Sequence, residues 1–287
     1  MKLSNPTEIK ALLERHGFEF QKKFGQNFLI NEAIPKRIAE SSLPEIKGEY
    51  ACLEIGPGIG VMTVELSKIY KKVCAVEIDK NLLPLLDETL ADTDNVEIIN
   101  QDVLKLDIAS VVKEKFDGIP CVVCANLPYY ITTPVIMHLL ESGYLFENIT
   151  VMVQKEVADR ICSPAGSEQY GAITAAISYY ANPKKLFTVS GGNFIPRPDV
   201  TSAVMRLDLY KTPPVKVEDK KVLFAVIRGA FARRRKTLLN SMPSEFPNIP
   251  KEKMQEIFEM SGLTGSERGE TLNLQDFAKI ADNICKI

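Results

Sequence analysis

The chain has 287 residues, 45% of them hydrophobic and 25% charged, a composition typical of a soluble globular protein with one large and one small domain. No run of about 18 apolar residues occurs, and residues 1–15 lack the apolar region of a signal peptide, so the sequence predicts no membrane span and a cytoplasmic protein. The formal net charge of -2 conceals a strong local asymmetry, which lies near the C-terminus.

The first predicted element is a short helix close to the N-terminus. Asn5 is suited to be its N-cap, Pro6 its first helical residue, and Gly17 ends it. Residues 22–29 then form a polar and aromatic loop ahead of another helix. We expect the side chains of this loop to contact a ligand or a partner.

Strands and helices alternate in the next hundred residues. The patterns predict strands at 50–55, 73–77, 96–100, 121–125 and 149–154, and helices at 61–70, 81–90, 108–115 and 134–141, the last capped by Thr133. Such alternation predicts an α/β fold with a parallel, doubly wound sheet and helices on both faces. Ligands bind such sheets at the carboxyl ends of the strands.

Four of the six cysteines, Cys52, Cys74, Cys121 and Cys124, lie in apolar, β-branched runs where a thiol behaves as a small hydrophobic group. Cys121 and Cys124 have the spacing of a zinc or redox pair, but neither a second pair nor a histidine cluster accompanies them. The sequence therefore predicts no bound metal.

A glycine-rich loop, residues 54–60, directly follows the first of these strands. Gly56 and Gly58 permit a tight turn and a close approach of backbone to ligand. Glu77, at the end of the second strand, can accept hydrogen bonds from both hydroxyls of a ribose, and Asp102, after the third, can accept one from an adenine amino group. The spacing is G-x-G-x-G rather than the G-x-G-x-x-G of nicotinamide-binding proteins, so the loop favours S-adenosylmethionine, which carries no pyrophosphate.

The stretch after the fourth strand, Asn126-Leu127-Pro128-Tyr129, is suited to an amino group on an aromatic base. The Asn126 side-chain oxygen and a backbone carbonyl can each accept one hydrogen of adenine N6, which leaves the nitrogen lone pair directed at an electrophile. Pro128 holds the turn rigid, and Tyr129 offers a face on which a base can stack. An isolated motif of this kind fits an ordinary strand-to-helix turn as well, so its meaning depends on the glycine loop. Together they predict direct in-line methyl transfer with neither a metal nor a covalent enzyme intermediate.

The C-terminal part begins after a helical stretch near 170–180 and two further strands near 185–189 and 203–209. Thr212-Pro213-Pro214 is a stiff linker. Beyond it, the patterns predict helices at 220–231, 235–242, 251–261 and 273–284.

Basic residues gather in residues 211–240, where nine lysines and arginines face two acidic residues, a local balance of 9 - 2 = +7. Such a run is often only a solvated helix face, but here residues 232–236 present several cations together, which suits a phosphate backbone. The side chains expected to contact nucleic acid are Arg228, Arg233, Arg234, Arg235 and Lys236.

The residues 54–61 loop, Glu77, Asp102 and the 126–129 motif resemble, in order and spacing, those of the bacterial small-subunit (16S) ribosomal RNA adenine N6,N6-dimethyltransferase family. Segments 25–29, 194–202 and 230–237 extend the resemblance to nearly the whole chain.

This resemblance implies a Rossmann-like, adenosylmethionine-dependent methyltransferase domain followed by a small all-α, RNA-facing domain. The linker places the boundary near residue 212, so we expect the first domain over residues 1–211 and the second over residues 212–287. It implies that Tyr129 and Phe194 sandwich the target base. It also implies a target of two adjacent adenosines near the 3′ end of 16S ribosomal RNA in an immature small subunit. The residues that it assigns to S-adenosylmethionine are Asn27, Leu29, Gly56, Glu77, Asp102 and Asn126.

Two other functions stay open at the level of the sequence. The related 23S-directed antibiotic-resistance methylases usually carry isoleucine at the position of Leu127 and match residues 233–237 less well. A ribosome-assembly or transcription factor could keep the fold and bind RNA without turnover, although it would need neither the 126–129 motif nor the glycine loop.

Overall fold

The computed structural model describes residues 3, 5–21, 25–233 and 235–287. Residues 22–24 of the predicted polar loop, and Arg234 of the basic run, lie outside this part of the chain. Two compact units form: one takes the chain up to residue 158 together with 184–209, and the other takes 159–183 and 210–287. The division expected from the sequence, at residue 212, differs from these units chiefly in residues 159–183, because Tyr170 and Ala175 pack into the core of the helical unit.

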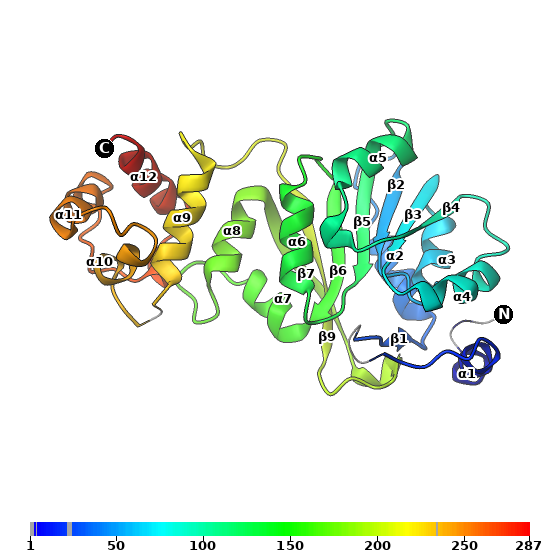
Figure 1. The fold of residues 1–287 in the computed structure, drawn as a ribbon. Helices are drawn as coiled ribbons and strands as arrows, with labels where there is room; N and C mark the ends of the chain where they lie inside the picture. Colours follow the sequence, from blue (N-terminus) through cyan, green and yellow to red (C-terminus); the bar gives the residue numbers. More distant parts are fainter. Residues whose placement is uncertain (1–2, 4, 22–24, 234) are drawn as a thin grey trace. The chain divides into compact units, whose positions relative to one another are not determined.

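A seven-stranded sheet forms the centre of the first unit, in the order β4-β3-β2-β5-β6-β9-β7 (Figure 1). The strands are β2 (Ala51–Ile55), β3 (Lys72–Glu77), β4 (Val96–Asn100), β5 (Cys121–Asn126), β6 (Asn148–Gln154), β7 (Ala181–Val189) and β9 (Ser202–Leu209). The five strands predicted from the alternating pattern run parallel, as expected. Strand β9 runs antiparallel to β6, so the complete sheet is mixed.

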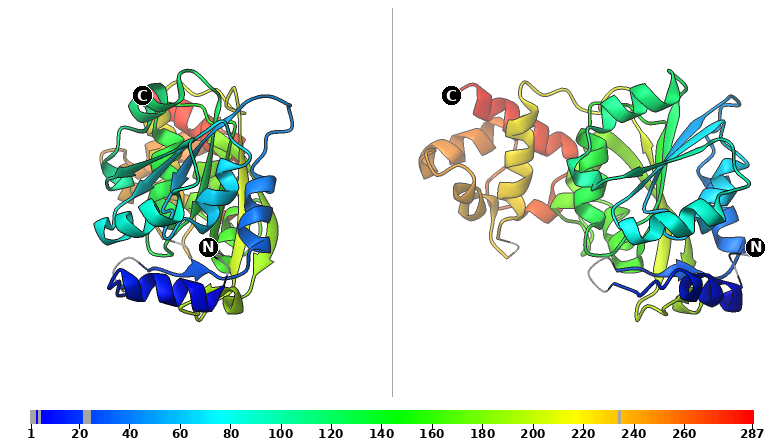
Figure 2. Two further views of the ribbon diagram at one scale, coloured as in Figure 1. Left: turned by 90° about the vertical axis from the view of Figure 1, so that its right-hand side faces the viewer. Right: turned by 45° about the vertical axis from the view of Figure 1, so that its right-hand side comes forward.

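Helices cover both faces of this sheet, which confirms the predicted α/β class (Figure 2). The helices in residues 5–161 are α1 (Pro6–Arg15), α2 (Ala33–Ser41), α3 (Val61–Ser67), α4 (Leu83–Thr89), α5 (Ile108–Phe116), α6 (Thr132–Glu141) and α7 (Lys155–Ile161). On one face, Ile38 of α2 and Leu66 of α3 pack against Cys52 and Val122 of the sheet. Within the described residues, no helix is long and apolar enough to cross a membrane.

The start of α6 corrects one expectation. The helix begins at Thr132 and its N-cap is Ile131, so Thr133 lies inside the first turn and is not the cap. Pro134 consequently occupies the third helical position. The missing N–H costs nothing there, because the first N–H groups of a helix have no intrahelical partner.

A second, two-stranded sheet was not predicted. It pairs β1 (Phe28–Leu29) with β8 (Phe194–Ile195) in antiparallel fashion, with Phe28 opposite Ile195 and Leu29 opposite Phe194. This pairing fixes the segment before α2 beside the chain that leads into β9.

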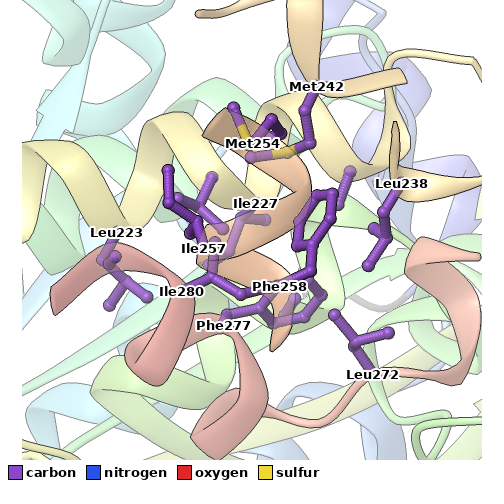
Figure 3. Close-up of a cluster of buried hydrophobic side chains, with 14 of the residues drawn as sticks. Leu223, Ile227, Leu238, Met242, Met254, Ile257, Phe258, Leu272, Phe277 and Ile280 are labelled. Atoms are coloured by element: carbon purple, nitrogen blue, oxygen red, sulfur yellow. The ribbon is translucent and has the colours of Figure 1, made fainter. Parts of the chain in front are cut away.

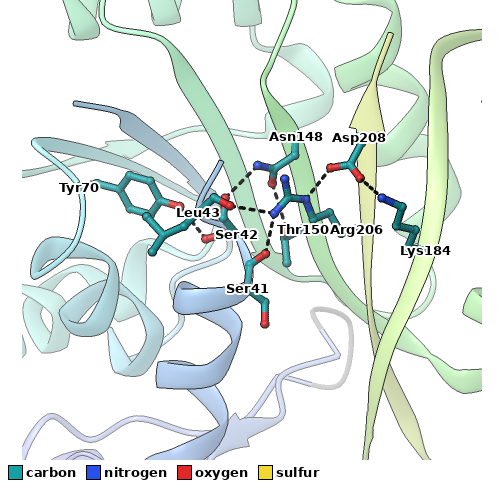
Figure 4. A network of polar contacts seen from close by, with 9 residues as sticks. All are labelled: Ser41, Ser42, Leu43, Tyr70, Asn148, Thr150, Lys184, Arg206 and Asp208. Carbon is teal, nitrogen blue, oxygen red and sulfur yellow. Dashed lines mark hydrogen bonds and ion pairs between the residues drawn. The ribbon is translucent and has the colours of Figure 1, made fainter. Parts of the chain in front are cut away.

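An arginine joins the end of α2 to the sheet (Figure 4). Arg206 on β9 donates to the carbonyl oxygens of Ser41 (3.0 Å) and Leu43 (2.9 Å) and pairs with Asp208 at 2.6 Å. Lys184 reaches the other oxygen of Asp208 at 2.9 Å. Arg206 therefore satisfies the Ser41 carbonyl at the end of α2, which has no intrahelical donor, and the Leu43 carbonyl just beyond the helix.

The second unit contains helices α8 (Ala172–Tyr180), α9 (Lys220–Phe231), α10 (Leu238–Ser241), α11 (Lys251–Met260) and α12 (Leu274–Cys285). Side chains from these helices meet in one apolar core, where Phe258 and Phe277 lie among Leu223, Ile227 and Ile280 (Figure 3). The predicted helical C-terminal region is thus present. Helix α10 is shorter than predicted because the chain turns before it, with the N–H of Lys236 bonded to the Arg233 carbonyl at 2.8 Å.

Candidate functional site

A cavity of about 250 Å³ lies at the carboxyl ends of the parallel strands. Its walls come from the loops after β2, β3, β4 and β5 and from residues 25–29, which we call the strap. It brings together all the residues that the sequence assigned to the cofactor and to the base-binding turn, with the exception of Phe194. These residues are Asn27, Leu29, Gly56, Gly58, Glu77, Asp102, Asn126, Leu127, Pro128 and Tyr129.

The glycine loop adopts a backbone that few other residues could follow. Gly56, Gly58 and Gly60 have φ values of +70°, +61° and +84°, in the left-handed region that favours glycine. A Cβ on Gly58 would also lie 3.1 Å from the ring of Phe28 in the strap. The loop is therefore shaped both by its own turn and by the aromatic ring that packs against it.

Glu77 ends β3 with its carboxylate held by two backbone N–H groups. Asp79 N donates to Oε1 at 2.8 Å and Gly58 N donates to Oε2 at 3.3 Å. Burial raises the pKa of Glu77 to about 7, although these two hydrogen bonds lower it in part. The carboxyl group faces the cavity at the place where the sequence expected a ribose.

Asp102 stands at the end of β4 and begins a short 3-10 helix, residues 103–105. One of its oxygens accepts from the backbone N–H of Leu104 at 3.0 Å. This cap fixes the carboxylate at the wall of the cavity, as its proposed contact with an adenine amino group requires.

Glu54, inside β2, has the most unusual environment at the site. The side chain is fully buried and lines the cavity, yet no hydrogen bond from the described residues reaches either carboxylate oxygen. Burial raises the pKa of Glu54 to about 8; the Thr63 hydroxyl, which lies close to the carboxylate but outside hydrogen-bonding geometry, lowers it, and the Glu77 carboxylate raises it further. A buried polar group without partners costs free energy, so a ligand that supplies a donor here would recover it.

Asn126, at the end of β5, has its amide oriented by the strap. Its Nδ2 donates to the backbone carbonyl of Asn27 at 3.3 Å. The side-chain oxygen is thereby the group left to accept hydrogens from a ligand. Leu127, the next residue, is buried, and its N–H donates to the Met152 carbonyl at 3.2 Å, which holds the turn on the sheet.

The two aromatic residues expected to sandwich a base have different surroundings. The Tyr129 hydroxyl shares a 2.9 Å hydrogen bond with the hydroxyl of the buried Ser202 on β9. Phe194 is only 4% exposed and belongs to the core cluster that contains Leu29. Phe194 is not part of the cavity wall, so its contact with a base stays a prediction.

The basic segment belongs to the second unit. Arg233, Arg235 and Lys236 are exposed in the turn between α9 and α10. Arg228, on α9, is also exposed but pairs with Glu245 at 3.0 Å, so its charge is partly compensated. Within the described residues, no group of three or more histidine, cysteine or acidic side chains could hold a metal ion.

Sequence reasoning did not single out Glu54, Gln26 or Asp79, all of which belong to this region. Glu54 was included in the glycine loop without a role of its own. Gln26 donates to Asp79 at 2.8 Å. The only signals were their places beside Gly56, Asn27 and Glu77.

Comparison with known proteins identifies the family to which the chain belongs. The family model of ribosomal RNA adenine dimethylase matches residues 17–282. The ribosomal RNA small subunit methyltransferase A of Lachnoclostridium phytofermentans is 51% identical over 284 residues, which cover 98% of this chain and 97% of that protein.

Solved structures resemble this one over most of its length. A dimethyladenosine transferase from Plasmodium falciparum has a TM-score of 0.73 at 25% identity, with 88% of this chain and 95% of that chain covered. The 23S rRNA methyltransferase ErmE has a TM-score of 0.66 at 23% identity, with 90% and 99% covered, a likeness that shows the fold alone.

Proposed function

The chain belongs to the ribosomal RNA adenine dimethylase family, and we propose that it methylates N6 of two adjacent adenosines near the 3′ end of 16S ribosomal RNA to N6,N6-dimethyladenosine. The small-subunit target is supported by the name of a relative that is 51% identical over almost the whole chain. We propose a partly assembled small subunit as the substrate, and therefore a cytoplasmic site of action.

The cavity is suited to S-adenosylmethionine, the methyl donor of this family. Gly58 leaves no room for a Cβ beside the Phe28 ring that also lines the cavity, and Glu54 offers a buried carboxyl without a hydrogen-bond partner among the described residues. When bound, the cofactor supplies a methyl group on a sulfonium centre, which an amine can attack directly. We assign the ribose hydroxyls to Glu77, the adenine amino group to Asp102, and contacts along the strap to Asn27 and Leu29.

The protein's own contribution is position and polarisation. The Asn126 side-chain oxygen accepts one hydrogen of the target N6, and a backbone carbonyl of residues 126–128 accepts the other, which directs the nitrogen lone pair toward the cofactor. Tyr129 stacks on the base, with its hydroxyl anchored on Ser202 at 2.9 Å. Pro128 keeps the turn rigid. No strong base is needed, since N6 sheds its proton readily once it is alkylated.

We assign RNA binding outside the cavity to the basic segment of the helical unit, residues 212–287 in the sequence-based division. Arg233, Arg235 and Lys236 are exposed there. Exposed cations of this kind can neutralise the phosphates of a nucleic-acid backbone. Arg228, paired with Glu245, would contribute less.

The observation that carries the proposal is the orientation of the Asn126 amide, with its nitrogen on the Asn27 carbonyl and its oxygen available at the cavity. Asn126→Ala should lower methyl transfer by about 100-fold or more, while calorimetry shows adenosylmethionine affinity reduced only modestly. Near-normal turnover would remove the assignment.

Labelled adenosylmethionine with unmethylated small and large ribosomal subunits distinguishes the other functions. Label in dimethyladenosine of 16S RNA supports the proposal. Label in 23S RNA indicates the antibiotic-resistance activity instead. Binding to the small subunit without label in either RNA indicates a non-catalytic assembly factor.

A further inference from the structure

The side chain of Gln26 holds the strap through both ends of its amide. Nε2 donates to Asp79 Oδ2 at 2.8 Å, and Oε1 accepts from the backbone N–H of Gln21 at 3.0 Å. Asp79 is 2% exposed, and its other oxygen accepts from Asn81 N at 3.1 Å. An amide is required here, because one end must donate and the other must accept.

Asp79 connects this amide to the carboxylate that we assign to the ribose. The backbone N–H of Asp79 donates to Glu77 Oε1 at 2.8 Å, and Gly58 N donates to Oε2 at 3.3 Å. Any shift of Asp79 therefore moves one of the two donors that fix Glu77. The strap, the end of β3 and the glycine loop form one hydrogen-bonded chain.

The other side of the strap leads to the amide that we assign to the target base. Asn27, directly after Gln26, presents the carbonyl that accepts from Asn126 Nδ2 at 3.3 Å. Its own side chain donates to the Gly25 carbonyl at 3.0 Å, which closes a local turn. A contact as long as 3.3 Å is easily lost when its acceptor moves.

We infer that Gln26 is a positioning residue: through Asp79 it sets the ribose-binding carboxylate Glu77, and through the strap backbone it sets the orientation of the Asn126 amide. This inference rests on the proposed function, since it takes the roles of Glu77 and Asn126 from there. Without the Gln26 amide, the buried Asp79 carboxylate loses a donor and the Asn27 carbonyl loses its anchor. Cofactor affinity and the rate of transfer then both decline.

Exchanging the hydrogen-bond donor of Gln26 with the acceptor of Asp79 tests this inference. Gln26→Ala should weaken adenosylmethionine binding about tenfold, as measured by calorimetry, and should lower the single-turnover rate at saturating cofactor by a further factor of about ten. Gln26→Glu opposes two carboxylates, and Asp79→Asn opposes two amide donors, so each should be at least as impaired. The double variant Gln26→Glu with Asp79→Asn restores one donor and one acceptor. It should return affinity and rate to within about threefold of the wild type.

Asn31→Ala is the matched control. Asn31 lies beyond the other end of the strap, where its amide donates to Asn193 Oδ1 at 2.9 Å and does not reach Glu77 or Asn126. It should leave both constants unchanged, even if the melting temperature falls.

Rescue of affinity and rate by the double variant is the result expected from a positioning role. A purely structural role for Gln26 predicts instead a lower melting temperature with unchanged affinity and rate, or a double variant no better than its worse parent, and either outcome overturns the inference. If the wild-type protein binds adenosylmethionine but methylates no small-subunit RNA, the proposed function fails. Even then, the adenosylmethionine affinity of the double variant shows whether Gln26 positions Glu77, because this measurement does not involve RNA.

Discussion

The buried carboxyl group of Glu54 makes the stability of the cofactor-free protein depend on pH in a predictable way. Its pKa in the folded protein is about 8, because burial disfavours the charged form, against an ordinary value of 4.5. Between these two values the folded protein retains a proton that the unfolded chain has released. The free energy of unfolding contributed by Glu54 is therefore fully present below about pH 4.5, declines as the pH rises, and is lost by about pH 8.

The size of this change in the free energy of unfolding follows from a difference of one bound proton between the folded and the unfolded chain. Within this window the free energy of unfolding should fall by about 1.4 kcal/mol per pH unit, or on the order of 5 kcal/mol over the whole range. Glu54→Gln removes the titration but keeps the size and shape of the side chain. The difference in free energy of unfolding, variant minus wild type, should therefore increase from pH 5 to pH 8 and then become constant.

Urea denaturation at intervals between pH 5 and pH 9, without cofactor, measures this difference. Glu77 titrates in both proteins and largely cancels in the comparison. Glu147→Gln, at an exposed position just before β6, is the control for replacing a glutamate by glutamine outside the cavity. Equal pH dependence in the wild type and Glu54→Gln would show that this carboxyl group is not held in its neutral form, and would refute the reasoning.

Three further outcomes are expected. Glu77→Ala should weaken adenosylmethionine binding by about 1 to 3 kcal/mol in a calorimetric titration, because it removes the acceptor at the ribose site; unchanged affinity would exclude that role. Neutralising Arg233 and Arg235 together should lower affinity for the small subunit and reduce its salt dependence by a slope of up to about two, with cofactor affinity untouched; equal slopes would leave these arginines as a solvated surface. Arg206→Leu should lower the free energy of unfolding by about 2 to 4 kcal/mol, whereas Lys184→Met, at a side chain that is 53% exposed, should cost less than about 1 kcal/mol; equal losses would contradict the central place given to Arg206.

The alternation of apolar patterns predicted most of the sheet because a buried parallel strand has a simple signal, a short apolar run between helices. The five strands from β2 to β6 fall within a residue or two of their expected bounds. The direction of β9 was not predictable in this way. Parallel and antiparallel strands that are buried on both faces present the same apolar run, and only the connection through the rest of the chain decides between them.

The candidate site, too, was predictable from the sequence only in part. Sequence motifs predicted the site residues at the ends of β2, β3, β4 and β5. The prediction was possible because the carboxyl ends of parallel strands meet at one edge of the sheet, whatever the connections between the strands. The strap was predicted to contact a ligand, first from its polar and aromatic residues and then from family resemblance, but the pairing that holds it in place was not predicted. The strap is held partly by the Gln26 side chain and partly by the pairing of β1 with β8, two strands of two residues each, which are too short to show any periodicity.

What no pattern could supply is the hydrogen-bonding state of each polar group. Glu54 and Glu77 are both acidic residues near the ends of neighbouring strands, and the sequence, which predicted a ribose contact for Glu77, did not predict how either carboxyl group is hydrogen-bonded. In the folded chain Glu77 receives two backbone donors and has a pKa near 7, whereas Glu54 receives none from the described residues and has a pKa near 8. The difference arises because Gly58 and Asp79 turn their N–H groups toward Glu77, and Asp79 is in turn held by Gln26 from a segment 53 residues away. The two carboxyl groups therefore differ because of how the loops assemble around them. Substitution of Gln26 should change the environment of Glu77 directly, while burial, the largest cause of the raised pKa of Glu54, stays in place.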